Sequence, residues 1–130
     1  MNNTKPRVLA VDDELLIRDL LYDFFNEKEW DVTVTESAEK ALDQMRAREF
    51  DILITDLKMP NMDGLTLIEK ARNQKPNLPV VVITGYPSVE SAVKCLRQKV
   101  DDYLVKPFNV TQLYKVVQGA LKNAEDKDSA

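Results

Sequence analysis

Five short runs of hydrophobic residues alternate along the chain with five longer stretches in which hydrophobic residues recur every three or four positions. Three runs are continuous and rich in β-branched residues, as in strands buried within a parallel sheet, whereas the second run alternates and is typical of an edge strand. The runs are residues 8–11, 32–34, 52–54, 80–83 and 103–105. The helical stripes fall within residues 16–25, 38–45, 65–71, 89–96 and 110–121.

Turn and cap residues separate these segments. Ser37, Ser88 and Asn109 each precede a helical stripe and are plausible N-caps, while proline and glycine fall between elements. Strict alternation of strand and helix predicts an α/β fold with a parallel sheet covered by helices on both faces. A chain of 130 residues suits one domain. We expect this domain over residues 1–124, and a flexible tail or the start of a linker over 125–130, where apolar periodicity is lost.

Polar residues that carry chemistry follow four of the predicted strands. Asp12 and Asp13 follow the first strand, Asp56 the third, Thr84 the fourth and Lys106 the fifth. The carboxyl ends of parallel strands meet at one edge of the sheet, where open α/β sheets bind their ligands. If these strands are neighbours, three carboxylates, one hydroxyl and one ammonium share a pocket.

Crowded carboxylates repel one another, so such a pocket calls for a cation. The chain has no histidine and one cysteine, which leaves hard oxygen ligands that suit Mg²⁺ far better than Zn²⁺. A lysine and a threonine hydroxyl could bind phosphoryl oxygens, and a carboxylate beside the metal could attack phosphorus to form an acyl phosphate.

Taken singly, each of these residues has an ordinary explanation: Asp13 could cap a helix starting at Glu14, and Lys106 could be a solvated loop residue. Their shared position at four strand ends favours a site.

Composition narrows the function further. The net charge is −4 without a basic run, which argues against direct binding of nucleic acid. No segment resembles a membrane span or a signal peptide, and the lone Cys95 agrees with a reducing compartment, so we expect a cytoplasmic protein. Cys95 itself is best interpreted as a small helical hydrophobe. Without histidine the chain cannot carry a phosphohistidine of its own, and a phosphoryl donor must be another molecule.

Four segments together resemble the motifs of bacterial response-regulator receiver domains. They are VLAVDDE at 8–14, DLKMPNMDG at 56–64, ITGY at 83–86 and DYLVKPF at 102–108. The resemblance extends over about residues 6–123, with the motifs in order and at the right separations. It implies the doubly wound, flavodoxin-like sheet that receivers are known to have, with strand order 2-1-3-4-5 and five helices on two faces.

The resemblance implies a phosphoacceptor, a metal site and a catalytic lysine. Asp56 would accept the phosphoryl group. Asp12 and Asp13 would hold Mg²⁺, together with Asp56 and the backbone carbonyl of Lys58. Lys106 would contact the incoming phosphoryl group.

The resemblance also implies a switch. Thr84 would contact the phosphoryl group beside Lys106, and the Tyr103 ring would rotate inward when Thr84 moves. Considered alone, a tyrosine that opens a strand is more commonly a packing residue. The Lys106–Pro107 peptide is expected to be cis, and Gly85 to leave a path to the phosphate.

A receiver of this kind is a signalling phosphoacceptor that catalyses only its own phosphorylation and dephosphorylation. The implied donor is a sensor histidine kinase or a histidine phosphotransfer protein, docked against the first helix, where Leu15 and Arg18 are candidate contacts. The face formed by the fourth helix, fifth strand and fifth helix would control an output domain or partner protein, and is a possible homodimer interface.

Two positions depart from the family pattern. Lys99-Val100 stands where Gly-Ala usually ends the fourth helix, which removes the easy left-handed stop and puts the geometry of the next loop in question. Lys58 and Tyr86 occupy the positions that tune phosphate lifetime, and both could shield or crowd an attacking water.

Three other functions fit the sequence less well. A phosphatase with an aspartyl nucleophile would need an acid two residues after it, where this chain has Lys58, and a substrate cap. A nucleotide-binding domain would need a glycine-rich loop after the first strand, where Asp12-Asp13-Glu14 stands. A passive, degenerate receiver conflicts with the presence of every phosphotransfer residue.

Overall fold

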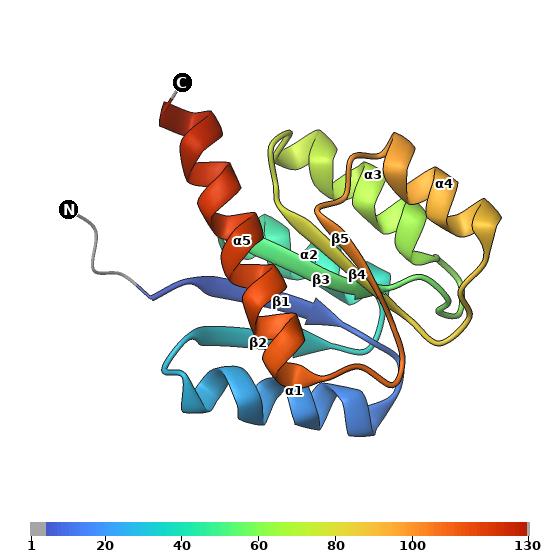
Figure 1. The fold of residues 1–130 in the computed structure, drawn as a ribbon, viewed down its shortest axis with the longest axis horizontal. Helices are drawn as coiled ribbons and strands as arrows, with labels where there is room; N and C mark the ends of the chain where they lie inside the picture. The colour runs from blue at the N-terminus through green and yellow to red at the C-terminus, as the bar shows by residue number, and fades with distance from the viewer. Residues whose placement is uncertain (1–4, 130) are drawn as a thin grey trace.

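The computed structural model describes the backbone of residues 5–129 and the side chains of residues 5–126. All strands are parallel and form one sheet in the order β2-β1-β3-β4-β5, which confirms the expected topology (Figure 1). The strands are β1 (Arg7–Val11), β2 (Asp31–Thr35), β3 (Ile52–Asp56), β4 (Val80–Thr84) and β5 (Asp102–Val105). The helices are α1 (Leu15–Glu27), α2 (Ala38–Ala47), α3 (Gly64–Gln74), α4 (Val89–Arg97) and α5 (Val110–Ser129).

The core consists of two layers, one on each face of the sheet, because successive strand residues point to opposite faces. In β1, Val8 and Ala10 pack under α1 and α5, whereas Leu9 and Val11 pack under α2, α3 and α4. The strands β3 and β4 are buried along their whole length, and β2 is an edge strand, as its alternating pattern predicted. None of the helices between residues 5 and 129 is long and apolar enough to cross a membrane.

Helix starts agree with the expected caps. The hydroxyl of Ser37 accepts from the Lys40 N–H, and that of Ser88 accepts from the Ser91 N–H. Asn109 Oδ1 accepts from two backbone N–H groups at the start of α5. Asp63 caps α3 in the same way. These bonds satisfy donors that have no partner inside a helix.

The fourth helix ends in a left-handed turn in spite of the missing glycine. Lys99 adopts φ 56°, its N–H donates to the Leu96 carbonyl, and the Val100 N–H donates to the Cys95 carbonyl at 3.2 Å. This is the Schellman pattern that glycine usually closes, here adopted by a lysine. Val100 and Cys95 both pack into the core beside α4, which supplies the apolar contact that accompanies the motif. The loop after α4 therefore has the geometry that glycine would give it, although a left-handed conformation is energetically unfavourable for a lysine.

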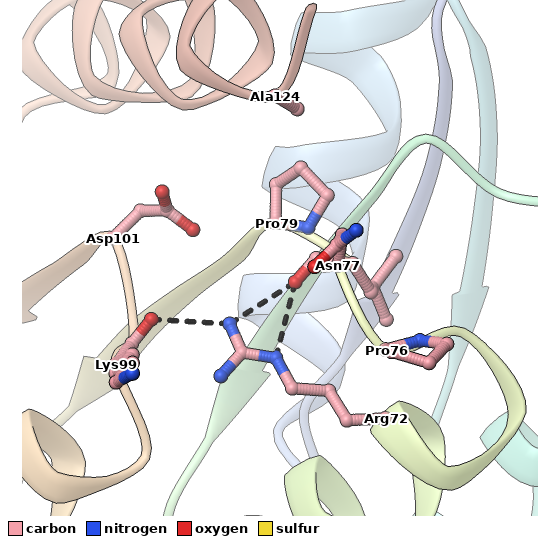
Figure 2. Close-up of a pocket in the computed structure, with 8 residues that line it drawn as sticks. Arg72, Pro76, Asn77, Pro79, Lys99, Asp101 and Ala124 are labelled. Carbon is pink, nitrogen blue, oxygen red and sulfur yellow. Dashed lines mark hydrogen bonds between the residues drawn. The ribbon is translucent and has the colours of Figure 1, made fainter. Parts of the chain in front are cut away.

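Arg72, near the end of α3, secures the same loop. Its guanidinium donates to the Leu78 carbonyl through Nε and Nη2, to the Lys99 carbonyl through Nη2 at 3.1 Å, and to the Gln98 carbonyl through Nη1. Figure 2 shows the guanidinium extended between the segment containing Asn77 and the loop containing Lys99. A side chain from α3 thus satisfies carbonyls at the C-cap of α4 and in the loop that follows, which have no helical partner.

The last helix is longer than the sequence suggested. α5 continues to Ser129, so the residues expected to form a tail from 125 are helical as far as the structure describes them. They contain neither glycine nor proline, and a helix can extend without an apolar face where it meets no breaker. In Figure 1, α5 crosses one face of the sheet and its last turns project beyond it.

Replacement of Lys99 by glycine should raise the free energy of unfolding by up to about 1 kcal/mol. The left-handed conformation costs an L-residue about 1–2 kcal/mol, and the greater freedom of glycine in the unfolded chain offsets part of the gain. The control is Lys94→Gly, at an exposed position within α4, which should lower the free energy of unfolding by about 0.5–1 kcal/mol. Urea unfolding of both variants measures the difference, and equal destabilisation by the two changes would contradict this account.

Candidate functional site

Lys106, which follows β5, is surrounded by carboxylates at the carboxyl edge of the sheet. Its Nζ lies 2.8 Å from Asp12 Oδ2, 2.9 Å from Asp56 Oδ2 and 2.7 Å from Glu14 Oε1. Asp12 and Asp56 are buried, whereas Glu14 is exposed. The sequence placed Lys106, Asp12 and Asp56 together correctly, and it missed Glu14. The signal for Glu14 was its position beside the two aspartates that follow β1.

Two effects act in opposite directions on the pKa values in this cluster: burial disfavours the charged forms, and attraction between opposite charges favours them. Burial raises the pKa of Asp12, and its ion pair with Lys106 and the hydrogen bond from the Glu14 N–H offset only part of this rise. Burial alone would lower the pKa of Lys106, but its ion pair with Asp12 and its hydrogen bonds with Glu14 and Asp56 outweigh burial and raise that pKa well above its ordinary value. Lys106 is therefore stabilised in its protonated form, and its positive charge faces several carboxylates.

Asp56 is held at the end of β3 by backbone contacts. Its Oδ1 accepts from the Leu57 N–H at 2.6 Å and from the Lys58 N–H at 3.3 Å. Gly64, at the start of α3, lies so close that a Cβ would overlap the Asp56 carbonyl oxygen, and its N–H donates to the Leu57 carbonyl. The motif glycine thus lets α3 begin directly against the backbone of the candidate phosphoacceptor.

The turn after β1 presents two aspartates in different ways. Asp12 Oδ1 accepts from the Glu14 N–H at 2.9 Å, and the Asp12 N–H donates to the Thr35 carbonyl at the end of β2. The Asp13 carboxylate is exposed and accepts no hydrogen bond from residues 5–126. The helix begins one residue later than the capping alternative assumed: Glu14 is the N-cap of α1, and its side chain bonds to Lys106 instead of the helix.

The donor set fits a hard divalent cation. One carboxylate oxygen from each of Asp12, Asp13, Glu14 and Asp56 lies within 4.8 Å of the others, and every candidate ligand is oxygen. Magnesium accepts such ligands and commonly bridges one or two carboxylates to a phosphate, whereas zinc prefers nitrogen and sulfur. Cys95, on α4, is buried in the core and does not belong to this group of ligands.

Thr84 ends β4, and its carbonyl accepts from the Lys106 N–H at 2.8 Å, whereas Tyr103 lies near the start of β5. Thr84 is buried, and its Oγ1 accepts from the Tyr86 N–H at 3.0 Å. Tyr103 is half-buried against the core under α4, and its hydroxyl lies 2.8 Å from the Ser91 Oγ of α4. A hydrogen bond therefore links the tyrosine of β5 to the first turns of α4.

The mouth of the site is an open cleft that includes Asp13, Glu14, Asp56 and Lys58 in its lining. Lys58 Nζ lies 5.2 Å from the centre of the exposed Tyr86 ring, within the range of a cation–π contact. Lys58 and Tyr86, which were expected from the resemblance to influence phosphate lifetime, are therefore in contact in this structure.

Two expectations concerned the loops after β4 and β5: a cis peptide before Pro107, and space beside Gly85. The Lys106–Pro107 peptide is cis, as expected. A Cβ on Gly85 would meet only the Lys106 side chain, at 3.7 Å, which is ordinary contact and leaves room for alanine.

Comparison with known proteins agrees with this geometry. The chain matches the family described as response regulator receiver domain over residues 8–118. The transcriptional regulatory protein ZraR of Escherichia coli O157:H7 is 32% identical over 129 residues, 99% of this chain and 29% of ZraR. The response regulator protein FleR of Pseudomonas aeruginosa is 38% identical over 111 residues, 85% of this chain and 24% of FleR. The chain thus spans between 24% and 29% of the length of these two relatives.

Solved structures show the same likeness. A CheY-like response regulator receiver domain protein from Methanospirillum hungatei has a TM-score of 0.91 at 29% identity, covering 95% of this chain and 99% of that one. NtrX from Brucella abortus, crystallised in complex with ADP, has a TM-score of 0.90 at 30% identity, covering 97% of this chain and 29% of NtrX. The sequence match, the fold and the acidic strand-end cluster lead to one conclusion: this chain belongs to the response regulator receiver domain family, the phosphoacceptor domains of two-component signalling.

Proposed function

We propose that this chain accepts a phosphoryl group on Asp56. The observation that carries the proposal is the contact between the buried Asp56 carboxylate and Lys106 Nζ at 2.9 Å, within a cluster of carboxylates. Asp56 Oδ1 is held by the Leu57 and Lys58 N–H groups, which leaves Oδ2 facing the cluster. When Oδ2 bonds to phosphorus, the donor's bond to that phosphorus breaks, and Lys106 is placed to bind an oxygen of the transferred group.

The proposed metal ligands are Asp12, Asp13, Asp56 and the backbone carbonyl of Lys58. Bound Mg²⁺ would neutralise charge on the carboxylates and on the phosphoryl oxygens. The exposed Asp13 carboxylate has no competing partner among residues 5–126 and is free to bind the cation. With Mg²⁺ bound, the carboxylates would be neutralised by two cations, and Lys106 could bind a phosphoryl oxygen.

The domain limits, the location and the partners are part of the same proposal. We propose the receiver domain over residues 1–124, a cytoplasmic location, and a phosphohistidine on a histidine kinase or phosphotransfer protein as donor. The exposed Leu15 and Leu16 of α1 favour docking beside the site. Relatives such as ZraR, of which the chain covers 29%, favour an output domain or partner protein as the target. The chain acts as a signalling phosphoacceptor and not as an enzyme on other substrates.

The signal would leave the site through Thr84 and Tyr103. We propose that Thr84 moves towards the phosphoryl group and that the Tyr103 ring follows, which alters the contact with Ser91 on α4. Val89 and Leu96 of α4 and Val105 of β5 are exposed apolar side chains on the face that responds. That face, α4-β5-α5, is the proposed surface for homodimerisation or output control.

Asp56→Asn should abolish phosphorylation by a small donor, because the amide keeps the shape of the side chain and removes the nucleophile. Incubation with acetyl phosphate and Mg²⁺, followed by intact mass, should add one phosphoryl group to the wild type and none to the variant. Asp43→Asn, an exposed change on α2, is the matched control and should accept phosphate normally. An acid-labile phosphate on Asp56→Asn would show that the acceptor lies elsewhere.

Asp13→Asn should abolish Mg²⁺ binding and phosphorylation while the free energy of unfolding in EDTA stays unchanged or rises slightly. The Asp13 carboxylate accepts no hydrogen bond from residues 5–126, and its removal relieves repulsion within the cluster. A change within about 0.5 kcal/mol of the wild type, or above it, is expected for this surface position. Chemical unfolding in EDTA measures this quantity, and a marked loss of stability there would mean that Asp13 is mainly structural.

Thr84→Ala should still accept a phosphoryl group on Asp56 but show little response on the α4-β5-α5 face. Tyr103→Ala should behave in the same way, because it removes the ring that follows Thr84. Amide exchange with and without beryllofluoride, a phosphoryl mimic, measures the response, and Thr84→Ser is the control that keeps the hydroxyl. Equal responses of α4 and α5 in wild type and Thr84→Ala would refute this route even if Asp56 is the acceptor.

A further inference from the structure

Arg18 of α1 makes a contact that its exposed neighbours on the helix do not. Its Nη1 donates to the backbone carbonyl of Asp12 at 2.9 Å, reaching back across the first turn of α1. Arg18 is half-buried, while the neighbouring Leu15 and Leu16 are exposed. The Arg18 side chain therefore binds the acidic turn after β1, unlike an exposed residue that has no contact within the domain.

The Asp12 carbonyl belongs to the peptide that joins Asp12 to Asp13. Asp12 is fully buried, and its other polar atoms are already held: the N–H by the Thr35 carbonyl, Oδ1 by the Glu14 N–H and Oδ2 by Lys106. Among residues 5–126, the bond from Arg18 is the only hydrogen bond to the peptide that joins Asp12 to Asp13. It fixes the plane from which the Asp13 side chain departs, and Asp13 has no hydrogen bond of its own from residues 5–126.

We propose that Arg18 is a positioning residue for the divalent-cation site, acting through the Asp12–Asp13 peptide. The proposal rests on the proposed function, since the cation is the one that the acidic cluster would bind. The carbonyl is buried, so loss of Arg18 leaves an acceptor without its donor and lets the peptide turn away. Groups that orient metal ligands in this way typically affect metal affinity about 10–100-fold.

The charge of Arg18 acts in the opposite direction to its hydrogen bond. A guanidinium near the site repels a divalent cation, so removing its charge alone should tighten Mg²⁺ binding. Removing its hydrogen bond should weaken Mg²⁺ binding by disordering the turn that carries Asp13. The sign of the change in Mg²⁺ affinity therefore separates orientation from simple electrostatics.

The experiment compares Arg18→Met with wild type and with Arg46→Met, which removes the same charge from an exposed position on α2. Titration of the ¹⁵N-labelled chain with Mg²⁺, followed by NMR, gives the dissociation constant. Arg18→Met should bind Mg²⁺ about tenfold more weakly, and the control should bind as the wild type does. In metal-free buffer, amide exchange at residues 12–14 should be faster in Arg18→Met only.

Phosphorylation provides a second readout. With acetyl phosphate, Arg18→Met should be slow at low Mg²⁺ and should recover at saturating Mg²⁺, because the defect is in cation binding. Unchanged or tighter Mg²⁺ binding overturns the proposal. A defect confined to a protein phosphohistidine donor, with normal Mg²⁺ affinity, also overturns it and makes Arg18 a docking contact.

Two further outcomes can be told apart. If Arg18→Met does not fold, Arg18→Gln takes its place, since its shorter side chain cannot span the turn to the carbonyl and should weaken Mg²⁺ binding equally; wild-type affinity in Arg18→Gln would then overturn the proposal. If the wild type takes no phosphoryl group at all, the proposed function fails. The Mg²⁺ titration still decides the role of Arg18 in that case.

Discussion

The structure of the site depends on the ion pairs between one ammonium group and several carboxylates, which lie at the carboxyl ends of the strands. Lys106 Nζ contacts Asp12, Asp56 and Glu14 within 2.9 Å, and two of these carboxylates are buried. Burial disfavours the ionised form of Asp12, and the ammonium group of Lys106 compensates part of that cost. A site with this surplus of negative charge is prepared for a second cation and for a phosphoryl group that arrives with it.

The surrounding fold holds these charges in place through backbone contacts. Parallel strands bring residues 12, 56, 84 and 106 to one edge, and the turns that follow the strands are fixed by N–H groups and by close approach of helices. Gly64 allows α3 to start against Asp56, and Arg18 bonds to the carbonyl of Asp12. Positioning of this kind lets electrostatics act without reorganisation when charge arrives.

At the opposite, amino-terminal ends of β4 and β5, one arginine bonds to several loop carbonyls. There Arg72 bonds to the carbonyls of Leu78, Gln98 and Lys99, and ties the end of α3 to the end of α4 (Figure 2). The start of α4 is instead connected to β5 by the hydrogen bond between Ser91 and Tyr103. The two ends of α4 are thus secured differently: several charge-assisted bonds hold one end, and a single hydroxyl pair links the other to the residue proposed as the switch.

The hydrophobic period and the turn residues predicted the alternation of strands and helices and the caps at Ser37, Ser88 and Asn109, because both are local signals. The strand order came from the resemblance of four motifs to receiver domains, and a parallel sheet in that order brings the strand-end residues Asp12, Asp56 and Lys106 together. Tertiary structure decided what depends on contacts between distant segments. The contacts of Glu14 with Lys106 and of Lys58 with Tyr86 fall in this class. So does the left-handed end of α4 at Lys99, which its backbone hydrogen bonds, the apolar contact of the next residue and the guanidinium of α3 stabilise against an unfavourable local preference.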